Sequence, residues 1–410
     1  MTGADTASRP CVLAINAGSS TLRFALYRAG ATLGLLARGK IAGLGRDDAD
    51  WEVQYTDGRE REAHRFEMAD RRGALAYLLK WLEAQPDFKD IRAIAHRVVH
   101  GMSHSEPEVA TAALLADLNR HVAIDPEHLP FELELINACQ RQYPRLPQVV
   151  CFDTAFHRGM PQVARMLAIP RRYQALGVER YGFHGLSYAY LMDELARLGD
   201  PVAARGRVIL AHLGNGASLA AVRDGRSVDT TMGFTPAAGI MMGSRSGDLD
   251  PGLASYLAQT EHMSTQEFQH MVNHAAGLLG VSETSADMRR LLESEASDQR
   301  AAEAVAMFCY QVRKGIGAFA AALGGLDTLV FAGGIGENAP AVRARICEGL
   351  EFLGLELDRP RNDAGAGMIS STNSRVSIRM IRTDEEQMLA RAALPFCGPR
   401  SDPVKRRTPS

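Results

Sequence analysis

Two stretches of the sequence place small polar residues and glycine in a turn between two apolar runs. Residues 12–27 read VLAINAGSSTLRFALY, and residues 208–222 read VILAHLGNGASLAAV. Gly18 and Gly214 in these turns let backbone N–H groups point toward an anion such as phosphate. Each copy alone could be an ordinary β-hairpin with a glycine turn. The repetition, with asparagine and serine in the turns, indicates instead a nucleotide bound between two similar halves.

Charged side chains follow two of the predicted strands. Arg97 lies near the end of the β-branched run 91–100, and Asp153 comes directly after the apolar run 148–152. Ligands gather at the carboxyl ends of strands in open α/β sheets, so Arg97 could bind an anion and Asp153 could be a metal-binding or catalytic carboxylate. A surface salt bridge for Arg97 and a turn cap for Asp153 are the alternatives.

Three further residues are candidate ligand contacts. His184 lies between glycines in YGFHG, and Arg245 lies in a long Gly/Met-rich loop, residues 230–251. A guanidinium in such a loop could bind phosphate or carboxylate with two hydrogen bonds. Glu385 follows Thr383 near a predicted helix start, where it is either a ligand or an acid favoured in the first turn.

A glycine-rich segment follows another predicted strand. The strand at 327–332 runs into GGIGEN at 333–338, and Asn338 is predicted to cap a helix that begins at Pro340. A strand, a glycine-rich turn and a helix N-terminus bind anions or nucleotides through free amides and the helix dipole. The segment is not a P-loop, because no G-K-[ST] occurs, and its dinucleotide fingerprint is incomplete.

Composition limits the classes of protein to which the chain can belong. A chain of 410 residues that is 46% hydrophobic is long enough for two or three domains. Its net charge of -2 excludes a nucleic-acid footprint. No apolar stretch reaches the roughly 18 residues of a membrane span, and the start shows no signal peptide. The 6 cysteines contain no C-x-x-C pair, so neither disulfides nor zinc is expected. We therefore expect a soluble, cytoplasmic protein.

Periodicity and capping signals position the other elements. Ser187 is predicted to cap the helix after YGFHG, and Ser264 with Glu267 is typical of a capping box. His128 falls in a short connection, where a lone histidine is more often solvated than functional. A third antiparallel strand is predicted near 51–55, and helices are predicted at 74–83, 111–121, 130–141 and 301–323.

Together these motifs resemble those of the acetate kinases. INAGSSTLRF, AHRVVHG, FDTAFH, YGFHG, HLGNGASL, MMGSRSGDLDP, GGIGEN and TDEE stand in the order and spacing of that family. The resemblance implies the α/β fold shared with actin, Hsp70 and sugar kinases: two similar RNase H-like domains with mixed sheets flanked by helices, and ATP in the cleft between them. It implies a first domain at 11–156, completed by a helix at 384–397, and a second, nucleotide-binding and dimerising domain at 157–383, in a homodimer.

The resemblance also implies roles for individual residues. The implied catalytic residues are Asp153, Arg97, Arg245, His184 and His128, and the acyl group would be bound by Arg97, Val99 and Pro236. The implied ATP-binding residues are Asn16, Ser19, Thr21, Arg23, His212, Leu213, Gly214, Asn215, Gly216, Asp287, Met288, Arg289, Gly334, Ile335, Gly336, Glu337 and Asn338. Asn16 and Glu385 are the implied contacts of Mg2+ (or Mn2+), with ATP as co-substrate and Asp153 as a further carboxylate near the metal.

The implied reaction explains this choice of side chains. Acetate is already ionised at neutral pH, so phosphoryl transfer to it requires no general base. The obstacle is the repulsion between a carboxylate and the γ-phosphate, which two arginines, a metal ion and a histidine offset in a water-poor cleft. The prediction is direct in-line transfer that gives acetyl phosphate and ADP, reversibly.

Three positions depart from the family pattern. Glu127 stands where the family commonly has an apolar leucine before the histidine, so either the loop is shifted or the acyl preference differs. Arg23 replaces the usual lysine after the first phosphate turn. Met102 replaces a second glycine after His100 and Gly101.

Two other functions remain open. The same site could prefer propionate or butyrate, or take pyrophosphate in place of a nucleotide. The fold also hosts ATP-driven binding proteins such as Hsp70 and actin-like filaments. A chaperone would need a peptide-binding domain after the ATPase, and we expect only a short tail beyond residue 398. Arg97 and Arg245 would also have no purpose in simple ATP hydrolysis.

Overall fold

The chain folds into two compact units, seen in a computed structural model that describes residues 9–18, 21–30, 32–44, 48–67, 71–199 and 205–398. Unit 1 contains the described residues up to Val98, residues 106–152, and the described residues from Glu385 on. Unit 2 contains residues 99–105 and 153–384. Within these described ranges, no helix is both long and apolar enough to cross a bilayer.

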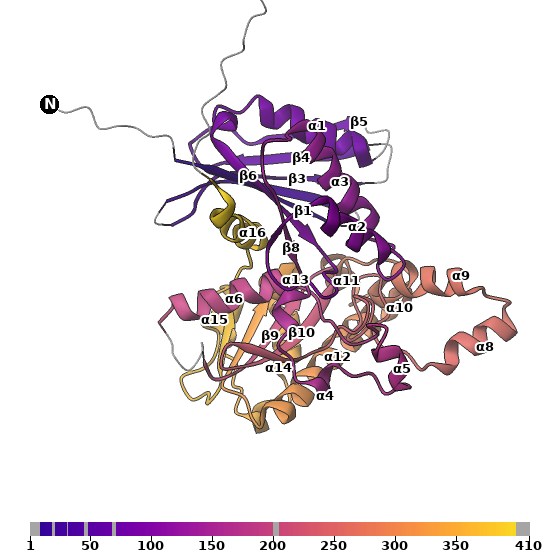
Figure 1. The fold of residues 1–410 in the computed structure, drawn as a ribbon. Helices are drawn as coiled ribbons and strands as arrows, with labels where there is room; N and C mark the ends of the chain where they lie inside the picture. The colour runs from indigo at the N-terminus through magenta and orange to yellow at the C-terminus, as the bar shows by residue number, and fades with distance from the viewer. Residues whose placement is uncertain are drawn as a thin grey trace, which may run out of the picture. The chain divides into compact units, whose positions relative to one another are not determined.

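Unit 1 is built on a mixed sheet (Figure 1). The order of its described strands is β5-β4-β3-β2-β1-β6-β8-β7. Strands β1 to β5 are antiparallel to one another, β6 runs parallel to β1, β8 runs parallel to β6, and β7 is antiparallel to β8. The elements are β1 (Cys11–Ala17), β2 (Thr21–Arg28), β3 (Gly34–Ala42), β4 (Asp48–Tyr55), β5 (Glu62–Glu67), α1 (Arg71–Glu83), β6 (Ile91–Val98), β7 (Glu108–Val109), α2 (Ala112–Arg120), α3 (Leu129–Gln142), β8 (Gln148–Phe152) and α16 (Glu385–Ala393).

Helices cover both faces of β1, which is buried at every position. On one face, Leu13 and Ile15 pack with Leu78 of α1 and Leu135 of α3 in the main core of the unit. The opposite face lies against α16, the yellow helix of Figure 1. Because successive strand residues alternate between faces, Asn16 points to the side of α16.

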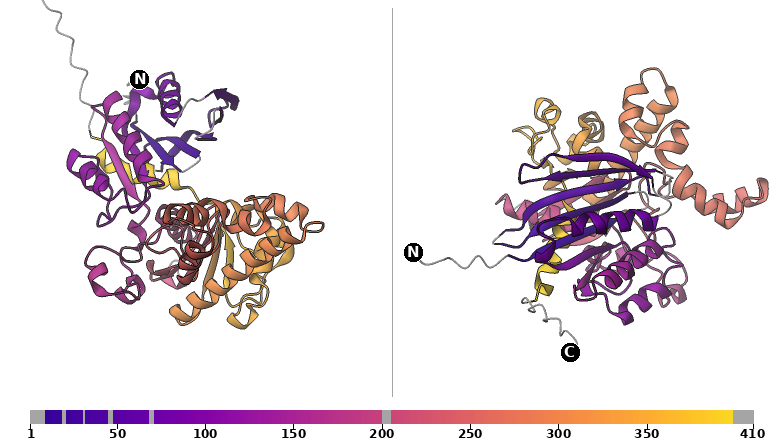
Figure 2. Two further views of the ribbon diagram at one scale, coloured as in Figure 1. Left: turned by 90° about the vertical axis from the view of Figure 1, so that its right-hand side faces the viewer. Right: turned by 90° about the horizontal axis from the view of Figure 1, so that it is seen from above.

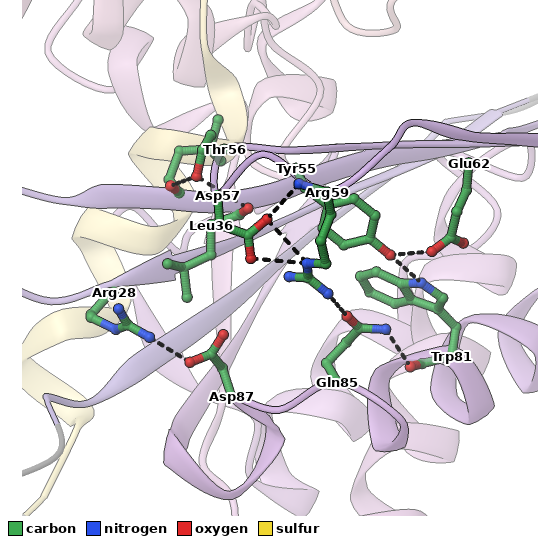
Figure 3. Close-up of polar contacts among 11 residues, drawn as sticks. Arg28, Leu36, Tyr55, Thr56, Asp57, Arg59, Glu62, Trp81, Gln85 and Asp87 are labelled. Atoms are coloured by element: carbon green, nitrogen blue, oxygen red, sulfur yellow. Dashed lines mark hydrogen bonds and ion pairs between the residues drawn. The ribbon is translucent and has the colours of Figure 1, made fainter.

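A polar network ties the β4–β5 hairpin to the end of α1 (Figure 3). The Arg59 guanidinium lies 3.8 Å from the ring centre of Tyr55 and donates to Gln85 Oε1 at 2.9 Å. Gln85 donates in turn to the Trp81 carbonyl at 3.1 Å, and Trp81 Nε1 donates to the Tyr55 hydroxyl at 3.2 Å. The Tyr55 hydroxyl donates to Glu62. These bonds satisfy the polar groups of a half-buried sheet edge and hold α1 on the sheet.

Unit 2 is built on a second mixed sheet with the strand order β11-β10-β9-β12-β13. Strands β9, β10 and β11 are antiparallel, and β12 runs parallel to both β9 and β13. The elements are α4 (Gln162–Arg165), α5 (Arg171–Gln174), α6 (Gly185–Arg197), β9 (Arg207–Leu213), β10 (Ala217–Arg223), β11 (Arg226–Thr230), α8 (Gly252–Thr260), α9 (Thr265–His270), α10 (Gly277–Ser282), α11 (Met288–Ser294), α12 (Gln299–Leu323), β12 (Thr328–Ala332), α13 (Gly333–Asn338), α14 (Pro340–Cys347), α15 (Arg359–Asp363) and β13 (Ser377–Met380).

The two sheets repeat one topology. Strands β3-β2-β1-β6-β8 of unit 1 and β11-β10-β9-β12-β13 of unit 2 have the same order and the same directions. Each begins with an antiparallel hairpin and continues through two parallel strands. The predicted fold class, two similar α/β units with mixed sheets flanked by helices, is therefore confirmed.

Helices also cover both faces of the sheet of unit 2. Helix α6 packs Tyr188 and Leu191 against Val208 and Leu210 of β9, whereas α12 approaches the opposite face at Leu219. Gly315 of α12 allows this approach, because a Cβ there would lie 2.5 Å from Leu219. Helices α8 and α9 project away from the sheet in two views (Figures 1 and 2).

Most predicted elements are present, but four strands were not predicted: β3, β5, β7 and β11. The prediction of a single third strand near 51–55 overlooked β3, whose glycines and charges interrupt the apolar alternation. Gly39 in β3 is required by packing, because a Cβ would lie 2.4 Å from the Phe24 ring. The capping box of Ser264 and Glu267 is confirmed by both reciprocal hydrogen bonds.

Two buried histidines should make the fold sensitive to acid. Burial lowers the pKa of His96 in unit 1 and of His157 in unit 2 from 6.5 to about 4. Above pH 6.5 both histidines are neutral in the folded and the unfolded chain, so neither makes stability depend on pH. Between pH 6.5 and 4 only the unfolded chain binds the protons. As the pH drops through this range, the free energy of unfolding therefore decreases by about 1.4 kcal/mol per pH unit for each histidine.

Urea unfolding of the wild type and of His96→Gln, at about pH 7 and about pH 5, measures this effect. We expect the variant to be less stable at pH 7 but to lose about 2 kcal/mol less than the wild type on acidification. An equal loss in both proteins would contradict the assignment.

Candidate active site

The first predicted phosphate turn follows β1 in unit 1. The Gly18 N–H donates to the Thr21 carbonyl at 2.8 Å and closes the turn. Ser19 lies outside the described residues. Arg23 is exposed on β2 and pairs directly with Asn16 of β1, so both side chains lie on the same face of the sheet.

Asn16 joins the end of β1 to the start of α16. Its side chain is only 5% exposed, and its Nδ2 donates to Glu385 Oε2 at 2.8 Å and to Glu386 Oε1 at 3.0 Å. Asn16 and Glu385 are predicted metal contacts, whereas Glu386, the neighbour of Glu385 in TDEE, is not. Two carboxylates therefore converge on one amide at the amino end of a helix.

These residues fit a magnesium ion by the chemistry of their donors. Mg2+ binds oxygen ligands and uses one or two carboxylates with water and substrate phosphates, rather than a full protein cage. The described part of the chain contains no group of three or more His, Cys, Asp or Glu side chains placed to hold a metal by themselves. Glu385 and the amide of Asn16 supply the kind of oxygen donors required.

Arg97 and His128 complete the predicted residues of unit 1. Arg97 Nη1 donates to the Ala17 carbonyl at 3.2 Å, which places the guanidinium at the end of β1 beside the first phosphate turn. His128 is only 8% exposed, not solvated, and its Nδ1 lies 2.9 Å from Oδ1 of the buried Asp125. Asp125 was missed, although its position three residues before the histidine is the signal. Glu127 is half-buried.

In unit 2, the segment before α6 brings His184 beside Asp153. His184 precedes the helix with a left-handed φ of 61°, and the Gly185 N–H donates to the Asp153 carbonyl at 3.0 Å. A Cβ on Gly185 would lie 2.0 Å from that oxygen, so only glycine allows this approach. Asp153 is 1% exposed. The predicted cap at Ser187 is wrong, because the helix begins at Gly185 and Ser187 lies in its first turn.

The second predicted phosphate turn, residues 214–216, joins β9 to β10 in unit 2. His184 and His212 lie beside this turn, together with Arg245 and Pro236. A methyl group on Gly216 would lie 3.3 Å from His184 Nε2 and 3.8 Å from Arg245 Nη1. Arg245 Nη1 also donates to the Pro236 carbonyl at 3.3 Å. The rings of His184 and His212 stack with their centres 4.2 Å apart. Val99 is buried in the same unit.

A cavity of about 690 Å3 lies next to this turn in unit 2. Its volume is in the range of ordinary small-molecule sites. Three segments predicted to bind nucleotide line it: the second phosphate turn, the start of α11, and α13. The predicted residues in its lining are Gly214, Asn215, Asp287, Met288, Arg289, Gly334, Ile335 and Asn338. Leu213, Gly216, Gly336 and Glu337 belong to the same segments but are not part of the lining.

The GGIGEN segment is a short helix rather than a turn. It forms α13, whose first N–H, on Gly333, donates to Glu337 Oε1 at 3.0 Å. The same carboxylate oxygen accepts the Thr383 N–H at 3.1 Å. The predicted capping role of Asn338 is wrong, because Ala339 precedes α14 and Asn338 Nδ2 donates back to the Gly334 carbonyl at 2.9 Å.

Comparison with known proteins places this geometry in a family. The family model of the acetokinases matches residues 11–391. The chain belongs to the acetokinase family. An acetate kinase of Rhodopseudomonas palustris is 43% identical over 387 residues, which are 93% of this chain and 96% of that protein.

Solved structures of this family share the fold. A propionate kinase from Francisella tularensis superposes with a TM-score of 0.87 at 35% identity, covering 93% of this chain and 98% of that one. The acetate kinase of Porphyromonas gingivalis superposes with a TM-score of 0.84 at 33% identity, covering 95% and 100%. These acetokinases are similar to this chain along nearly its whole length.

Proposed function

We propose that this acetokinase is an acetate kinase, which transfers the γ-phosphoryl group of ATP to acetate and gives acetyl phosphate and ADP, reversibly. One placement carries the proposal: Arg245 Nη1 and His184 Nε2 both approach the turn glycine Gly216, next to the cavity lined by Gly214 and Asn215. A guanidinium and an imidazole at a phosphate turn supply positive charge and N–H donors to a phosphoryl group in transfer.

The remaining candidate residues have roles in the same reaction. Arg97, held beside the first phosphate turn, would bind the acyl carboxylate, with Val99 and Pro236 against its alkyl part. No general base is required, because acetate is already ionised at neutral pH. The segments 214–216, 287–289 and 334–338 would bind ATP. Catalysis would then consist of positioning and electrostatic stabilisation.

Asn16 and Glu385, which belong to unit 1, would hold Mg2+. Asp153, which belongs to unit 2, stays a predicted carboxylate of the metal site. When bound, the ion would neutralise charge on the phosphate oxygens of ATP. Arg23, exposed on the face that carries Asn16, would add positive charge beside the first phosphate turn.

Propionate kinase is the second candidate, and two observations favour it. The solved propionate kinase from Francisella tularensis shares this fold at 35% identity. Glu127 is half-buried directly before His128, where a carboxylate would alter the fit of a short alkyl group. The homodimer and the cytoplasmic location implied by the family stay predictions, which light scattering and cell fractionation would test.

Acyl-phosphate formation tests the function directly. Purified enzyme, MgATP and acetate, propionate or butyrate are incubated in parallel, and the product is trapped as a hydroxamate. We expect the strongest signal with acetate, because the relative that is 43% identical to this chain is an acetate kinase. A signal only with propionate or butyrate would keep the kinase and change its substrate. No signal with any of the three acids would refute the proposal.

Removal of either proposed arginine should abolish most of the turnover. Arg97→Ala and Arg245→Ala each lose a charge-assisted donor to the reacting anions, so we expect kcat to fall by about 100-fold or more with the fold intact. Arg197→Ala is the matched control, because Arg197 forms a surface pair with Glu194 on α6. Near-normal turnover of Arg245→Ala would refute its role.

Filling the cavity of unit 2 should block the nucleotide. Gly334 lines the cavity, and a Cβ there would contact nothing within 4 Å, so Gly334→Leu should fold and occupy ligand volume. We expect at least about tenfold weaker binding of a fluorescent ADP analogue in Mg2+. Gly317→Leu on α12, where a Cβ is equally open, is the control. An unchanged Kd for Gly334→Leu would place the nucleotide elsewhere.

A further inference from the structure

Two histidines at the second phosphate turn are held in the same unusual way. The imidazoles of His184 and His212 stack at 4.2 Å with 24° between their planes. Each has a serine hydroxyl 2.8 Å from its Nδ1: Ser218 for His184 and Ser187 for His212. The Nε2 atoms point toward the turn, because methyl groups on Gly216 and Gly214 would lie 3.3 and 3.6 Å from His184 Nε2 and His212 Nε2.

A second hydroxyl group is hydrogen-bonded to each serine. The Tyr188 hydroxyl lies 2.5 Å from Ser218 Oγ, and the Thr383 hydroxyl lies 2.8 Å from Ser187 Oγ. Each imidazole therefore ends a chain of two hydroxyl groups, one through Ser218 and one through Ser187. Each hydroxyl can donate only one proton, so the direction of a chain decides which nitrogen of its histidine carries hydrogen.

The chain through Ser218 includes a backbone contact at its far end. The backbone of His212 also hydrogen-bonds to the Tyr188 hydroxyl, and a main-chain N–H in that position makes the phenol oxygen an acceptor. When the phenol donates its single proton to Ser218 Oγ, Ser218 donates its own proton to His184 Nδ1, and the hydrogen of neutral His184 lies on Nε2.

The chain through Ser187 begins on a fixed backbone. The Thr383 N–H is bound to Glu337 Oε1 at 3.1 Å, and the same oxygen accepts the first N–H of α13. This bond anchors Thr383 beside Ser187. When Thr383 donates to Ser187 Oγ, Ser187 donates to His212 Nδ1, and the hydrogen of His212 also lies on Nε2. The opposite direction would present a lone pair of His212 to the phosphate turn.

We propose that Tyr188, Ser218, Thr383 and Ser187 are positioning residues that hold His184 and His212 in the Nε2–H tautomer, so that both rings present an N–H donor at the second phosphate turn. The role of these donors rests on the proposed phosphoryl transfer, but the tautomers themselves do not. An N–H donor preorganised at the phosphate requires no rearrangement during the reaction, whereas a lone pair there would repel the phosphate oxygens. Because none of the four residues needs to touch the substrate, their loss should act on kcat more than on KM.

The tautomers can be measured without substrate. Long-range 1H–15N correlation spectra of the full-length protein labelled with 15N-histidine, near pH 8, distinguish a protonated Nε2 from a protonated Nδ1. His184→Gln and His212→Gln assign the two signals. We expect both histidines to be neutral with hydrogen on Nε2. Hydrogen on Nδ1 of either ring in the wild type would overturn the proposal for that chain, whatever the activity.

Variants of Thr383 test the chain of hydroxyl groups through Ser187. Thr383→Val keeps the shape and loses the hydroxyl, so we expect Nδ1–H of His212 to appear and kcat to fall about tenfold with little change in the KM for ATP. Thr383→Ser restores the hydroxyl and should restore both. A His212 tautomer unaffected by Thr383→Val would overturn the role of Thr383. Tyr188→Phe gives the same test for His184 should Thr383→Val not fold.

Ser227→Ala is the matched control for these variants. Ser227 Oγ lies 2.8 Å from His157 Nδ1, a third serine–imidazole pair in the same unit. We expect its removal to change the signal of His157 and to leave the tautomers of His184 and His212 as they are. If both rings carry hydrogen on Nε2 but no acyl phosphate forms, the proposed function is refuted and the positioning role of the hydroxyl groups stands. If acyl phosphate forms but the rings carry hydrogen on Nδ1, the positioning role is refuted and the proposed function stands.

Discussion

Burial of both faces of the central strand in each unit constrains where polar chemistry can lie. All seven residues of β1 are buried, and β9 is nearly as enclosed, between α6 and α12. Such a strand can carry charged or polar ligand contacts mainly at its carboxyl end. In each sheet, the strand parallel to the central one ends at the same edge as that strand. Arg97 at the end of β6 therefore lies beside the first phosphate turn, and α13 after β12 begins beside the second. One strand arrangement, used twice, thus places the residues of both turns.

Close backbone approaches then bring the proposed catalytic side chains to those ends. Gly185 lets the segment of His184 pass against the Asp153 carbonyl, and Gly216 leaves room between His184 and Arg245. The GGIGEN helix is held from below by Arg343, which is fully buried and donates to the carbonyls of Gly336 and Glu337.

The side chains around the turns suit a reaction between two anions. Such a reaction requires positive charge and N–H donors in fixed positions, rather than a base with a perturbed pKa. In unit 2 the hydroxyl groups behind the two imidazoles supply that fixation, since each ring is bonded through Nδ1 and directed through Nε2. In unit 1 the paired acids of α16 fix Asn16 in the same manner.

The sequence by itself determined the repeated hairpins, the long helix that the structure places at 299–323, and the capping box at Ser264, because each depends on residues a few positions apart. It also identified three segments that the structure brings around one cavity. Only the tertiary structure decided that Ser187 bonds to His212 and Thr383 instead of capping a helix, and that Glu386 joins Glu385 at Asn16. These partners lie 25 to 370 residues apart, and their meeting depends on strand register and helix packing, which local sequence patterns do not specify.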